Sequence, residues 1–456
     1  MIELHPEKKM PLYEQLYNAL AQDIRSGALQ PGKALPGRRT MAAQLGISTN
    51  TVDTAYQMLA AEGLAVTRPR SGFFVQETGG MLHTRPQHSV VPAPKATPKN
   101  TVSNQDDILY DLSTGSIDTS LFPARSWGRI QKELMYQRGD MQGDENLRAQ
   151  IAAYLGEYRG VDCTADQVVV GAGVEYLLGC LAHLFAGSTA AVENPGYSRT
   201  RAVLENNGIP CVPVEIDESG LPIRALEQSG ANLCYVTPSH HFPTGVTMPA
   251  PRRAQLLAWA AAKPGRFILE DDYDSEFRFA TRPLPSLQGM SGANGPVVYL
   301  TTFSKSLAPG MRIACMVLPQ GLLERYQSDF SMYANTVSRY EQQTLCEFMA
   351  NGYFARHIAR MRLTYKRRME AFAAALHAGL DFLLTLPGAG GEQAMVQAAA
   401  KQGVRLKGLS EYYMQDAAHC RPDTVVAGYS GLQAEDIPAA AAALGRAWRQ
   451  MSHSII

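Results

Sequence analysis

The chain has 456 residues, which is long enough for two or three domains and a large core. Apolar residues make up 45% of it and charged residues 18%, a composition that excludes an intrinsically disordered protein. The formal net charge is zero, so any surface that attracts nucleic acid must be a local basic patch.

The seven cysteines are scattered, with no CxxC pair and no histidine at metal-ligand spacing. We therefore expect reduced thiols and no metal site. The N-terminus lacks an apolar signal core, and no run of about 18 apolar residues occurs. These features predict a cytoplasmic protein that does not enter a membrane.

The first part of the chain predicts three helices and a hairpin. An apolar residue recurs at every fourth position from Leu12 to Ile24, and Gly27 ends this helix. A turn with two prolines leads to a shorter helix over 38–45, which is broken at Gly46.

A third helix follows the short glycine turn, which makes a helix-turn-helix. Ser48 or Thr49 can cap this helix, which runs to about Glu62. After Gly63, the segment LAVTRPRSGFFV alternates as two short strands around RPRSG, as in a β-hairpin wing.

Residues 10–76 resemble the winged helix-turn-helix of the GntR class, which implies double-stranded DNA as a partner. In that class the helix over 48–62 enters the major groove. The resemblance implies that its first side chains face DNA: Ser48, Thr49, Asn50 and Thr51. It places four arginines near phosphates or a minor groove: Arg38, Arg39, Arg68 and Arg70. Many members have arginine where this chain has Thr49, which leaves its base preference open. The alternative is a helical subdomain with a solvated arginine face.

The composition predicts a boundary between two folded parts. Residues 77–108 contain several prolines among Ser, Thr, Gln and Asn and few large apolar residues. This segment cannot bury a core and is typical of a flexible linker. We therefore expect a DNA-binding domain over 1–76 and a second domain over 109–456.

Strand-like runs alternate with helical stretches throughout the second part. This order predicts an α/β domain with a mostly parallel sheet, whose ligands gather beyond the strand ends. Helical stretches and the closing segment predict a smaller C-terminal α+β subdomain over about 330–456.

Two strand-end loops suit a phosphate and a flat ring. Gly173 lies at a strand-to-helix junction, where the backbone N–H groups of Gly173, Val174 and Glu175 can hold a phosphate. In the segment ENPGY, Tyr197 offers an aromatic face near the next strand end.

A third loop carries acidic residues. In FILEDDYDSEF, strand alternation puts Asp271 and Tyr273 on one side. A buried carboxylate there can keep a pyridine nitrogen protonated, while Tyr273 hydrogen-bonds a phenolic ring oxygen. Taken alone, an acidic strand end is more often a solvated rim.

The segment TTFSKSLAPGMRIACMVLP places Lys305 between two serines, after the β-type run VVYLTT. Arg312 and a second apolar run follow. A lysine at a strand end, beside hydroxyls and an arginine, suits a Schiff base to an aldehyde cofactor with a phosphate. Taken alone, an SK pair is more often an ordinary turn.

Read together, these motifs resemble fold-type I aminotransferases, which use pyridoxal 5′-phosphate, over about 110–450. They are MQGDENLRAQIAAYLGEYRGV, ENPGY, TPSHHFPTG, EDDYDSEFRF and TFSKSLAPGMR. Fused to the N-terminal domain, the chain is identified as a member of the MocR/GabR subfamily of transcriptional regulators.

The resemblance implies a role for each loop residue. Lys305 is the Schiff-base lysine, Asp271 partners the pyridine nitrogen, Tyr273 contacts the ring oxygen and Tyr197 stacks on the ring. The choice of Asp271 over Asp272 rests on strand alternation. The phosphate is assigned to Thr302, Ser304, Arg312 and the amides of 173–175.

The sequence departs from the aminotransferase pattern in three places. Phe242 replaces the asparagine that precedes PTG and touches the ring oxygen. The substrate-carboxylate arginine before the glycine of TVVAGY is missing, and Arg421, slightly upstream, is the candidate to replace it. The segment near 371–388 is compressed, as though a strand and loop were absent.

The leading hypothesis is a regulator that senses an amino compound through external aldimine formation at Lys305. The alternatives are an active aminotransferase, in full or half-transamination, with an appended DNA-binding module, and a regulator that senses pyridoxal phosphate itself. Both resemblances imply a homodimer that reads paired half-sites of an operator.

Overall fold

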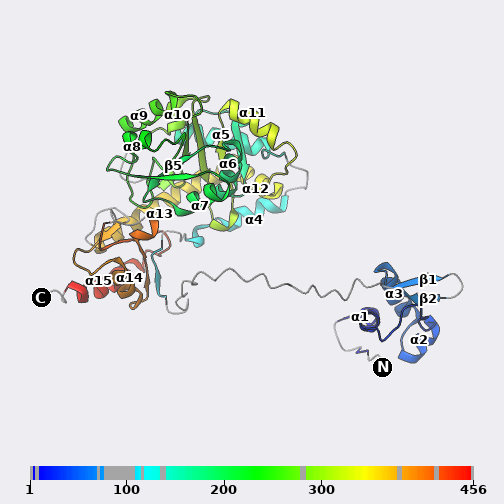
Figure 1. Ribbon diagram of the computed structural model, residues 1–456. Coiled ribbons are helices and arrows are strands. Elements are labelled where there is room, and N and C mark those ends of the chain that lie inside the picture. The colour runs from blue at the N-terminus through cyan, green and yellow to red at the C-terminus, as the bar shows by residue number, and fades with distance from the viewer. Residues whose placement is uncertain are drawn as a thin grey trace. The chain divides into compact units, whose positions relative to one another are not determined.

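The computed structural model describes residues 4–5, 10–68, 72–76, 108–113, 118–133, 140–277, 284–376, 383–414 and 421–452. Contacts divide the chain into two compact units, Met1–Val102 and Ser103–Ile456 (Figure 1). Arg70 and nearly all of the predicted linker lie outside the described residues.

The first unit contains three helices and a two-stranded antiparallel sheet, as predicted. Their bounds are α1 (Leu12–Ser26), α2 (Arg38–Leu45), α3 (Thr49–Ala61), β1 (Ala65–Arg68) and β2 (Gly72–Val75). Gly27 and Gly46 end α1 and α2 in the left-handed conformation, with φ of 79° and 66°, which glycine adopts without strain. Ser48, one of the two predicted caps, caps α3.

A seven-stranded sheet forms the centre of the second unit, in the order β4-β10-β9-β8-β7-β5-β6. Its strands are β4 (Val168–Gly171), β5 (Ala190–Asn194), β6 (Cys211–Glu215), β7 (Leu233–Val236), β8 (Phe267–Asp271), β9 (Val297–Thr302) and β10 (Ala314–Val317). Only β10 runs antiparallel to its neighbours. The predicted, mostly parallel sheet is confirmed.

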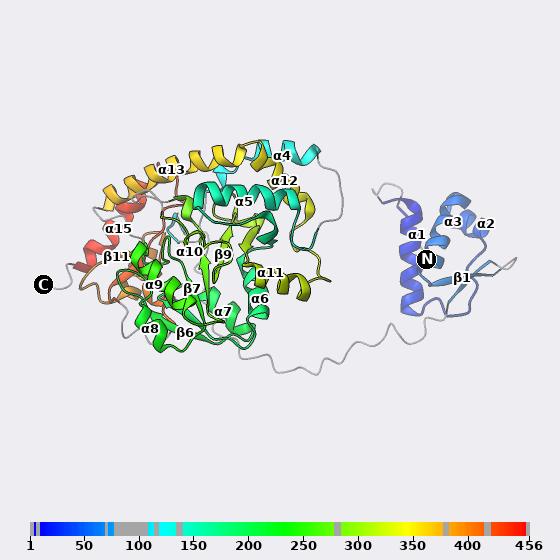
Figure 2. The same ribbon diagram turned by 90° about the horizontal axis from the view of Figure 1, so that it is seen from above.

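Helices cover both faces of this sheet. Neighbouring residues along a strand point to opposite faces, so they contribute to two different apolar cores. Leu300 contributes to the apolar core under α6, α7 and α11, and Tyr299 to the core under α4, α5, α12 and the start of α13. Figure 2 shows α5 and α13 on the side of the sheet opposite α6. The bounds are α4 (Ala124–Glu133), α5 (Glu145–Arg159), α6 (Val174–Leu184), α7 (Ser198–Asn206), α11 (Gln320–Asp329), α12 (Arg339–Ala350) and α13 (Tyr353–Leu376).

Three further helices cover the part of the sheet toward the edge strand β6, on the same face as α5. They are α8 (Ile223–Gln228), α9 (Ala250–Ala261) and α10 (Leu287–Ser291). Among the described residues, no helix is long and apolar enough to span a membrane.

The smaller subdomain has its own core, built on a three-stranded antiparallel sheet in the order β11-β14-β13. A second, parallel pair joins β3 to β12. The elements are β3 (Tyr110–Asp111), β11 (Leu383–Thr385), α14 (Glu392–Ala400), β12 (Val404–Arg405), β13 (Lys407–Gly408), β14 (Thr424–Val426) and α15 (Ile437–Ser452).

The predicted start of this subdomain, near residue 330, is wrong. Apolar residues of α12 and of the first turns of α13, such as Phe348 and Phe354, pack on the large sheet. The subdomain core instead takes Phe372, from the far end of α13, and Leu112 beside β3. Residues 377–382, inside the stretch predicted to be compressed, lie outside the described residues.

The direction of the strands brings six loops of the sheet to one edge. The carboxyl ends of β4, β5, β6, β7, β8 and β9 meet there, as in other open α/β sheets. Because β10 runs the opposite way, its beginning lies at the same edge, together with Arg312 just before it.

Candidate functional site

Lys305 lies in the turn that follows β9, and its side chain is partly buried. Burial lowers the pKa of its amine below the ordinary value of 10.5, and attraction by Asp274 acts in the opposite direction. A lowered pKa leaves more of the amine neutral, which is the nucleophilic form. The turn is therefore suited to a lysine that attacks an aldehyde.

Asp271 is the last residue of β8 and is buried. Its Oδ2 atom accepts a hydrogen bond from the Tyr235 hydroxyl. Its Oδ1 atom, also buried, has no hydrogen-bond partner among the described residues. Burial raises the pKa of Asp271 to about 7, although the Tyr235 hydrogen bond opposes this. A buried acceptor without a donor is costly, and the N–H of a protonated pyridine would satisfy it.

The adjacent carboxylate has a different environment. Asp272 Oδ2 accepts from Arg159 Nε at 2.6 Å and from the Tyr299 hydroxyl at 2.6 Å. Arg159 also donates to the Ser239 hydroxyl at 3.0 Å. Asp272 therefore belongs to a buried ion pair with Arg159, the last residue of α5. The assignment of Asp271 to a cofactor nitrogen stays a prediction.

Tyr273 is positioned by a different feature from the predicted one. Strand β8 ends at Asp271, so strand alternation does not extend to Tyr273. The Tyr273 hydroxyl donates to the backbone oxygen of His240 at 3.1 Å, and the two rings stack with centroids 6.3 Å apart. His240 Nδ1 in turn lies 2.7 Å from Asp274 Oδ2.

Gly173 and Arg312 meet at the start of α6. Gly173 has a φ of 95°, and a Cβ atom there would lie 2.5 Å from Arg312 Nη2. Arg312 itself has a φ of 49°, which is unusual for a residue other than glycine. Its guanidinium forms an ion pair with Glu175. Burial raises the pKa of Glu175, but hydrogen bonds from its own backbone N–H and from Arg312 outweigh this, so that the pKa is lowered overall.

The predicted cradle of three amides is smaller in the structure. The N–H of Gly173 donates to the Gly171 oxygen at 2.8 Å, so it is not available to a phosphate. The sharp turn that ends β4 causes this bond. Val174 and Glu175 are the first residues of α6, where the helix leaves N–H groups without intrahelical acceptors.

The hydroxyls of Thr302 and Ser304, both close to Lys305 in the chain, differ in their hydrogen bonds. Thr302 Oγ1 accepts the N–H of Ser304 at 3.1 Å and donates to the Ile313 oxygen at 3.4 Å. The Ser304 hydroxyl is buried and lacks a hydrogen-bond partner within the described part of the chain. Ser304 is thus the hydroxyl that can still donate to an anion.

Phe242, which replaces the usual asparagine, lies in a row of three aromatic rings. Its ring meets that of Tyr197 edge-on at 5.9 Å and that of Tyr412 edge-on at 5.0 Å. The Gly196 N–H donates to the Tyr412 oxygen at 2.9 Å. Phe242 therefore joins the loop of Tyr197 to the smaller subdomain. Tyr197 itself remains 41% exposed.

Three side chains of this region were not identified in the sequence. They are Tyr235, which binds Asp271; Asp274, which pairs with His240; and the buried Glu193. Glu193 accepts from the Thr237 N–H and hydroxyl at 2.9 and 2.8 Å, and burial raises its pKa to about 7. The order of the strands, which places Tyr235 beside Asp271, cannot be read from one sequence.

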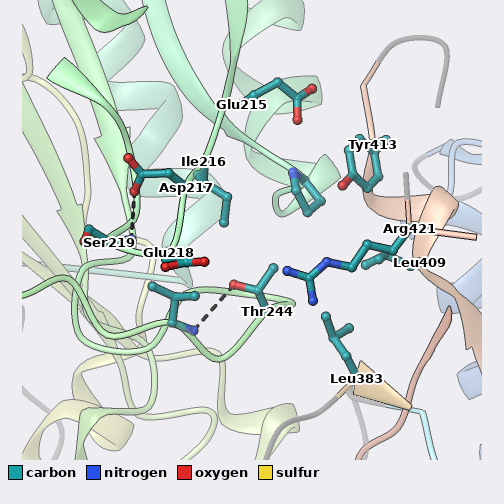
Figure 3. A pocket seen from close by; sticks show the side chains of 12 residues that line it. Glu215, Ile216, Asp217, Glu218, Ser219, Thr244, Leu383, Leu409, Tyr413 and Arg421 are labelled. Carbon is teal, nitrogen blue, oxygen red and sulfur yellow. Dashed lines mark hydrogen bonds between the residues drawn. The ribbon is translucent and has the colours of Figure 1, made fainter. Parts of the chain in front are cut away.

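Arg421 is not brought together with these residues. It lines a pocket of about 900 Å³ between the large sheet and the smaller subdomain (Figure 3). The residues around the pocket are Pro195, Glu215, Ile216, Asp217, Glu218, Ser219, Thr244, Val246, Leu383, Leu409, Tyr413 and Arg421. None of the predicted cofactor residues is among them.

In the first unit, the predicted DNA-facing residues at the start of α3 fall into two groups: Ser48 and Thr51 bond to each other, whereas Thr49 and Asn50 do not. Ser48 Oγ accepts the Thr51 N–H at 3.1 Å, and the two hydroxyls lie 2.8 Å apart. These side chains therefore stabilise the helix end. Thr49 and Asn50 are exposed.

The three described arginines predicted to meet DNA differ in their contacts. Arg38 forms an ion pair with Asp53, whose other oxygen accepts from Gln57 at 2.9 Å. The Arg68 guanidinium lies 4.4 Å from the centre of the Phe74 ring, and Arg39 is exposed.

Two family profiles match the chain. The one described as "Bacterial regulatory proteins, gntR family" matches residues 12–75, and "Aminotransferase class I and II" matches residues 110–398. The second covers more than half of the chain.

Known proteins share both parts. The chain is 37% identical to the "Uncharacterized HTH-type transcriptional regulator YdeL" of Bacillus subtilis (strain 168), over 96% of this chain and 97% of the relative. It is 30% identical to the "Probable rhizopine catabolism regulatory protein MocR" of Rhizobium meliloti, over 95% and 92%. The crystal structure of LysN, the alpha-aminoadipate aminotransferase of Thermus thermophilus, matches 76% of this chain and 94% of its own, with 25% identity and a TM-score of 0.64.

These matches agree with the fold of both parts of the chain. The chain belongs to the MocR/GabR subfamily of GntR transcriptional regulators, in which a winged helix-turn-helix is fused to an aminotransferase class I and II domain.

Proposed function

We propose that this protein is a DNA-binding transcriptional regulator that holds pyridoxal 5′-phosphate at Lys305 and senses a small amino compound there. The observation that carries the proposal is a pair of buried polar atoms, Asp271 Oδ1 at the end of β8 and Ser304 Oγ directly before Lys305. Both lack a hydrogen-bond partner among the described residues. One suits a protonated ring nitrogen and the other an anion.

Different residues of the chain bind the different parts of the cofactor in this proposal. The Lys305 amine, with its lowered pKa, is the nucleophile. Asp271 holds a proton at the ring nitrogen, and Tyr197 offers its exposed ring face. We assign the phosphate to the Ser304 hydroxyl, the Arg312 guanidinium and the N–H of Val174 at the start of α6; Thr302 lies beside them, but its hydroxyl already donates to the Ile313 oxygen. Pyridoxal phosphate supplies an aldehyde that condenses reversibly with primary amines.

The solved relative supports this choice of cofactor. Its crystal structure contains N-(5′-phosphopyridoxyl)-L-leucine, in which the cofactor is joined to an amino acid. In our proposal an incoming amine takes the place of the Lys305 amine, and the released lysine changes the packing around it. That change alters the affinity for an operator.

The absorbance spectrum of the purified protein tests the proposal. We expect added pyridoxal phosphate to give a visible band in the native protein, and no such band in Lys305→Ala. Arg224→Met, on the exposed surface of α8, should keep the band. A panel of primary amines should then shift the band, and those that shift it should change operator affinity. If none of them changes operator affinity, the sensing role is wrong.

Retention of Lys305 and Asp271 also favours a second function, that of an aminotransferase. The lowered pKa of Lys305 suits the transfer of a proton on the substrate. Repeated turnover of an amino donor with a keto acid acceptor would favour this function, whereas a single half-reaction or none would favour sensing.

We also propose a homodimer, since winged-helix regulators read paired half-sites. Sedimentation of the protein with a DNA duplex that carries two half-sites should give two chains per duplex. One chain per duplex would contradict this.

A further inference from the structure

The pocket around Arg421 lies between two walls of different origin. One wall is the loop after the edge strand β6, from Glu215 to Ser219. The other belongs to the smaller subdomain, with Leu383 and Leu409. Its volume of about 900 Å³ falls within the range of roughly 300 to 1,000 Å³ that is usual for small-molecule sites.

The carboxylates of this pocket are not equivalent. Asp217 pairs with Arg252 at 2.8 Å and accepts the Ser219 N–H at 2.7 Å. Glu215 accepts from the side-chain amide of Asn194. Glu218 makes no hydrogen bond or ion pair with any residue that the structure describes. Glu218 is therefore the carboxylate of this pocket with neither a cation nor a hydrogen-bond donor among the described residues, and it can receive a cationic ligand group.

Opposite charges face one another across the pocket. Figure 3 shows the carboxylate of Glu218 and the guanidinium of Arg421 pointing into it from opposite walls, with Thr244 between them. Apolar side chains line the rest, including Ile216, Val246 and Leu383. An arginine suits a carboxylate, which it can bind through two hydrogen bonds.

This pocket is separate from the lysine site, but two of its lining residues lie close in the chain to the aromatic row. Pro195 and Thr244 line it, and each lies two positions along the chain from a member of the aromatic row of Tyr197, Phe242 and Tyr412. Lys305 does not line it. A molecule in this pocket therefore has no need to react with the cofactor lysine.

We infer that this pocket is a second small-molecule site, which binds a zwitterionic amino compound without a covalent bond. Its carboxylate pairs with Arg421, its cationic nitrogen pairs with Glu218, and its aliphatic part packs on the apolar lining. The inference goes beyond the proposed function, because it requires neither Lys305 nor pyridoxal phosphate. It also gives Arg421 a ligand outside the cofactor site.

Titration calorimetry on the full-length protein tests the inference, with glycine betaine and its longer-chain homologues as probes. Their quaternary nitrogen cannot condense with an aldehyde, so binding at the lysine site by that route is excluded. We expect at least one homologue to bind the native protein. Glu218→Gln and Arg421→Met should each raise its Kd about tenfold or more, since each removes one charged partner.

Matched controls lie on the surface of α8, close to the pocket in sequence. Glu227→Gln and Arg224→Met make the same chemical changes at exposed positions and should leave the Kd unchanged. Lys305→Ala should also bind the probe with unchanged affinity. Unchanged thermal unfolding would show that each variant is folded.

Three outcomes would overturn the inference. They are no binding by any homologue, binding that survives both pocket variants, and loss of binding in Lys305→Ala. Failure of the proposed function is detected separately, by the absence of the cofactor band or of its response to primary amines.

Discussion

Asp271 and Asp272 show how two adjacent carboxylates acquire different roles. Asp272 is neutralised by Arg159 and bonded by Tyr299, so its charge is stable in the interior. Asp271 receives one hydrogen bond, from Tyr235, and has no cation beside it among the described residues. Its charge is stabilised only when a cationic partner, such as a protonated ring nitrogen, is bound.

Removal of this charge should stabilise the cofactor-free protein in a pH-dependent way. Burial raises the pKa of Asp271 from 3.8 to about 7, so stability is lost as the pH rises from the lower value to the higher one. Asp271→Asn keeps the acceptor for Tyr235 but cannot ionise. We expect its unfolding free energy at about pH 8 to exceed that of the native protein by at most about 4 kcal/mol.

Urea unfolding at about pH 8 and pH 4 checks this prediction. The difference should shrink to a small fraction of its value at pH 8, because at pH 4 Asp271 is protonated in the folded state and only partly ionised in the unfolded state. Asp272→Asn is the control and should destabilise at pH 8, because it leaves Arg159 buried without its partner. An equal effect of Asp271→Asn at both pH values would contradict the prediction.

At the residue scale, the sequence located the lysine turn and the acidic strand end because both follow apolar runs that end abruptly. It did not locate Tyr235, since its contact with Asp271 depends on β7 lying next to β8. It placed Tyr273 on the strand, although the chain leaves the strand at Asp271. Local patterns thus identified the residues, whereas pairings between strands required the fold.

At the element scale, the direction of β10 could have been predicted. Only a short turn, without a crossover helix, separates β9 from β10, and parallel neighbours need a longer connection. The placement of α11 and α12 could not have been predicted from the sequence, because an apolar helix face does not specify which sheet it covers. The contacts of α12 and of the first turns of α13 with the large sheet moved the boundary of the smaller subdomain.

The helices of the DNA-binding unit support a prediction about Arg38. Its ion pair with Asp53 joins α2 to α3, and both residues lie near the exposed start of α3. Asp53→Asn should release Arg38 and remove a negative charge that repels phosphates. We expect tighter binding to non-specific duplex DNA, with a log–log salt dependence steeper by about 0.9 if one more phosphate is neutralised.

Fluorescence anisotropy with a random duplex, measured over a series of salt concentrations, gives this slope. Asp23→Asn, on α1, removes the same charge at another site in the unit and is the matched control. Equal slopes for the native protein and Asp53→Asn would show that Arg38 already contacts phosphate or never does.

At the scale of the whole molecule, any signal from the lysine site must leave it through contacts with other parts. The aromatic row offers one such route, because Tyr197 is one of the residues that we propose to hold the cofactor, while Tyr412 belongs to the smaller subdomain. The backbone bond from Gly196 to Tyr412 reinforces it. A packed interface of this kind transmits small shifts, since close-packed rings cannot deform independently.

Tyr412→Ala should therefore weaken the response to an amine without removing the cofactor. Loss of the buried ring should cost about 3 kcal/mol of stability, and the amine-dependent change in operator affinity should fall to a small fraction of the native value. Tyr412→Phe keeps the ring against Phe242 and should preserve the response. Operator affinity is measured with and without an amine that shifts the absorbance band, at a temperature where both variants are folded. A full response in Tyr412→Ala, with an unchanged band, would show that the signal leaves the lysine site by another route.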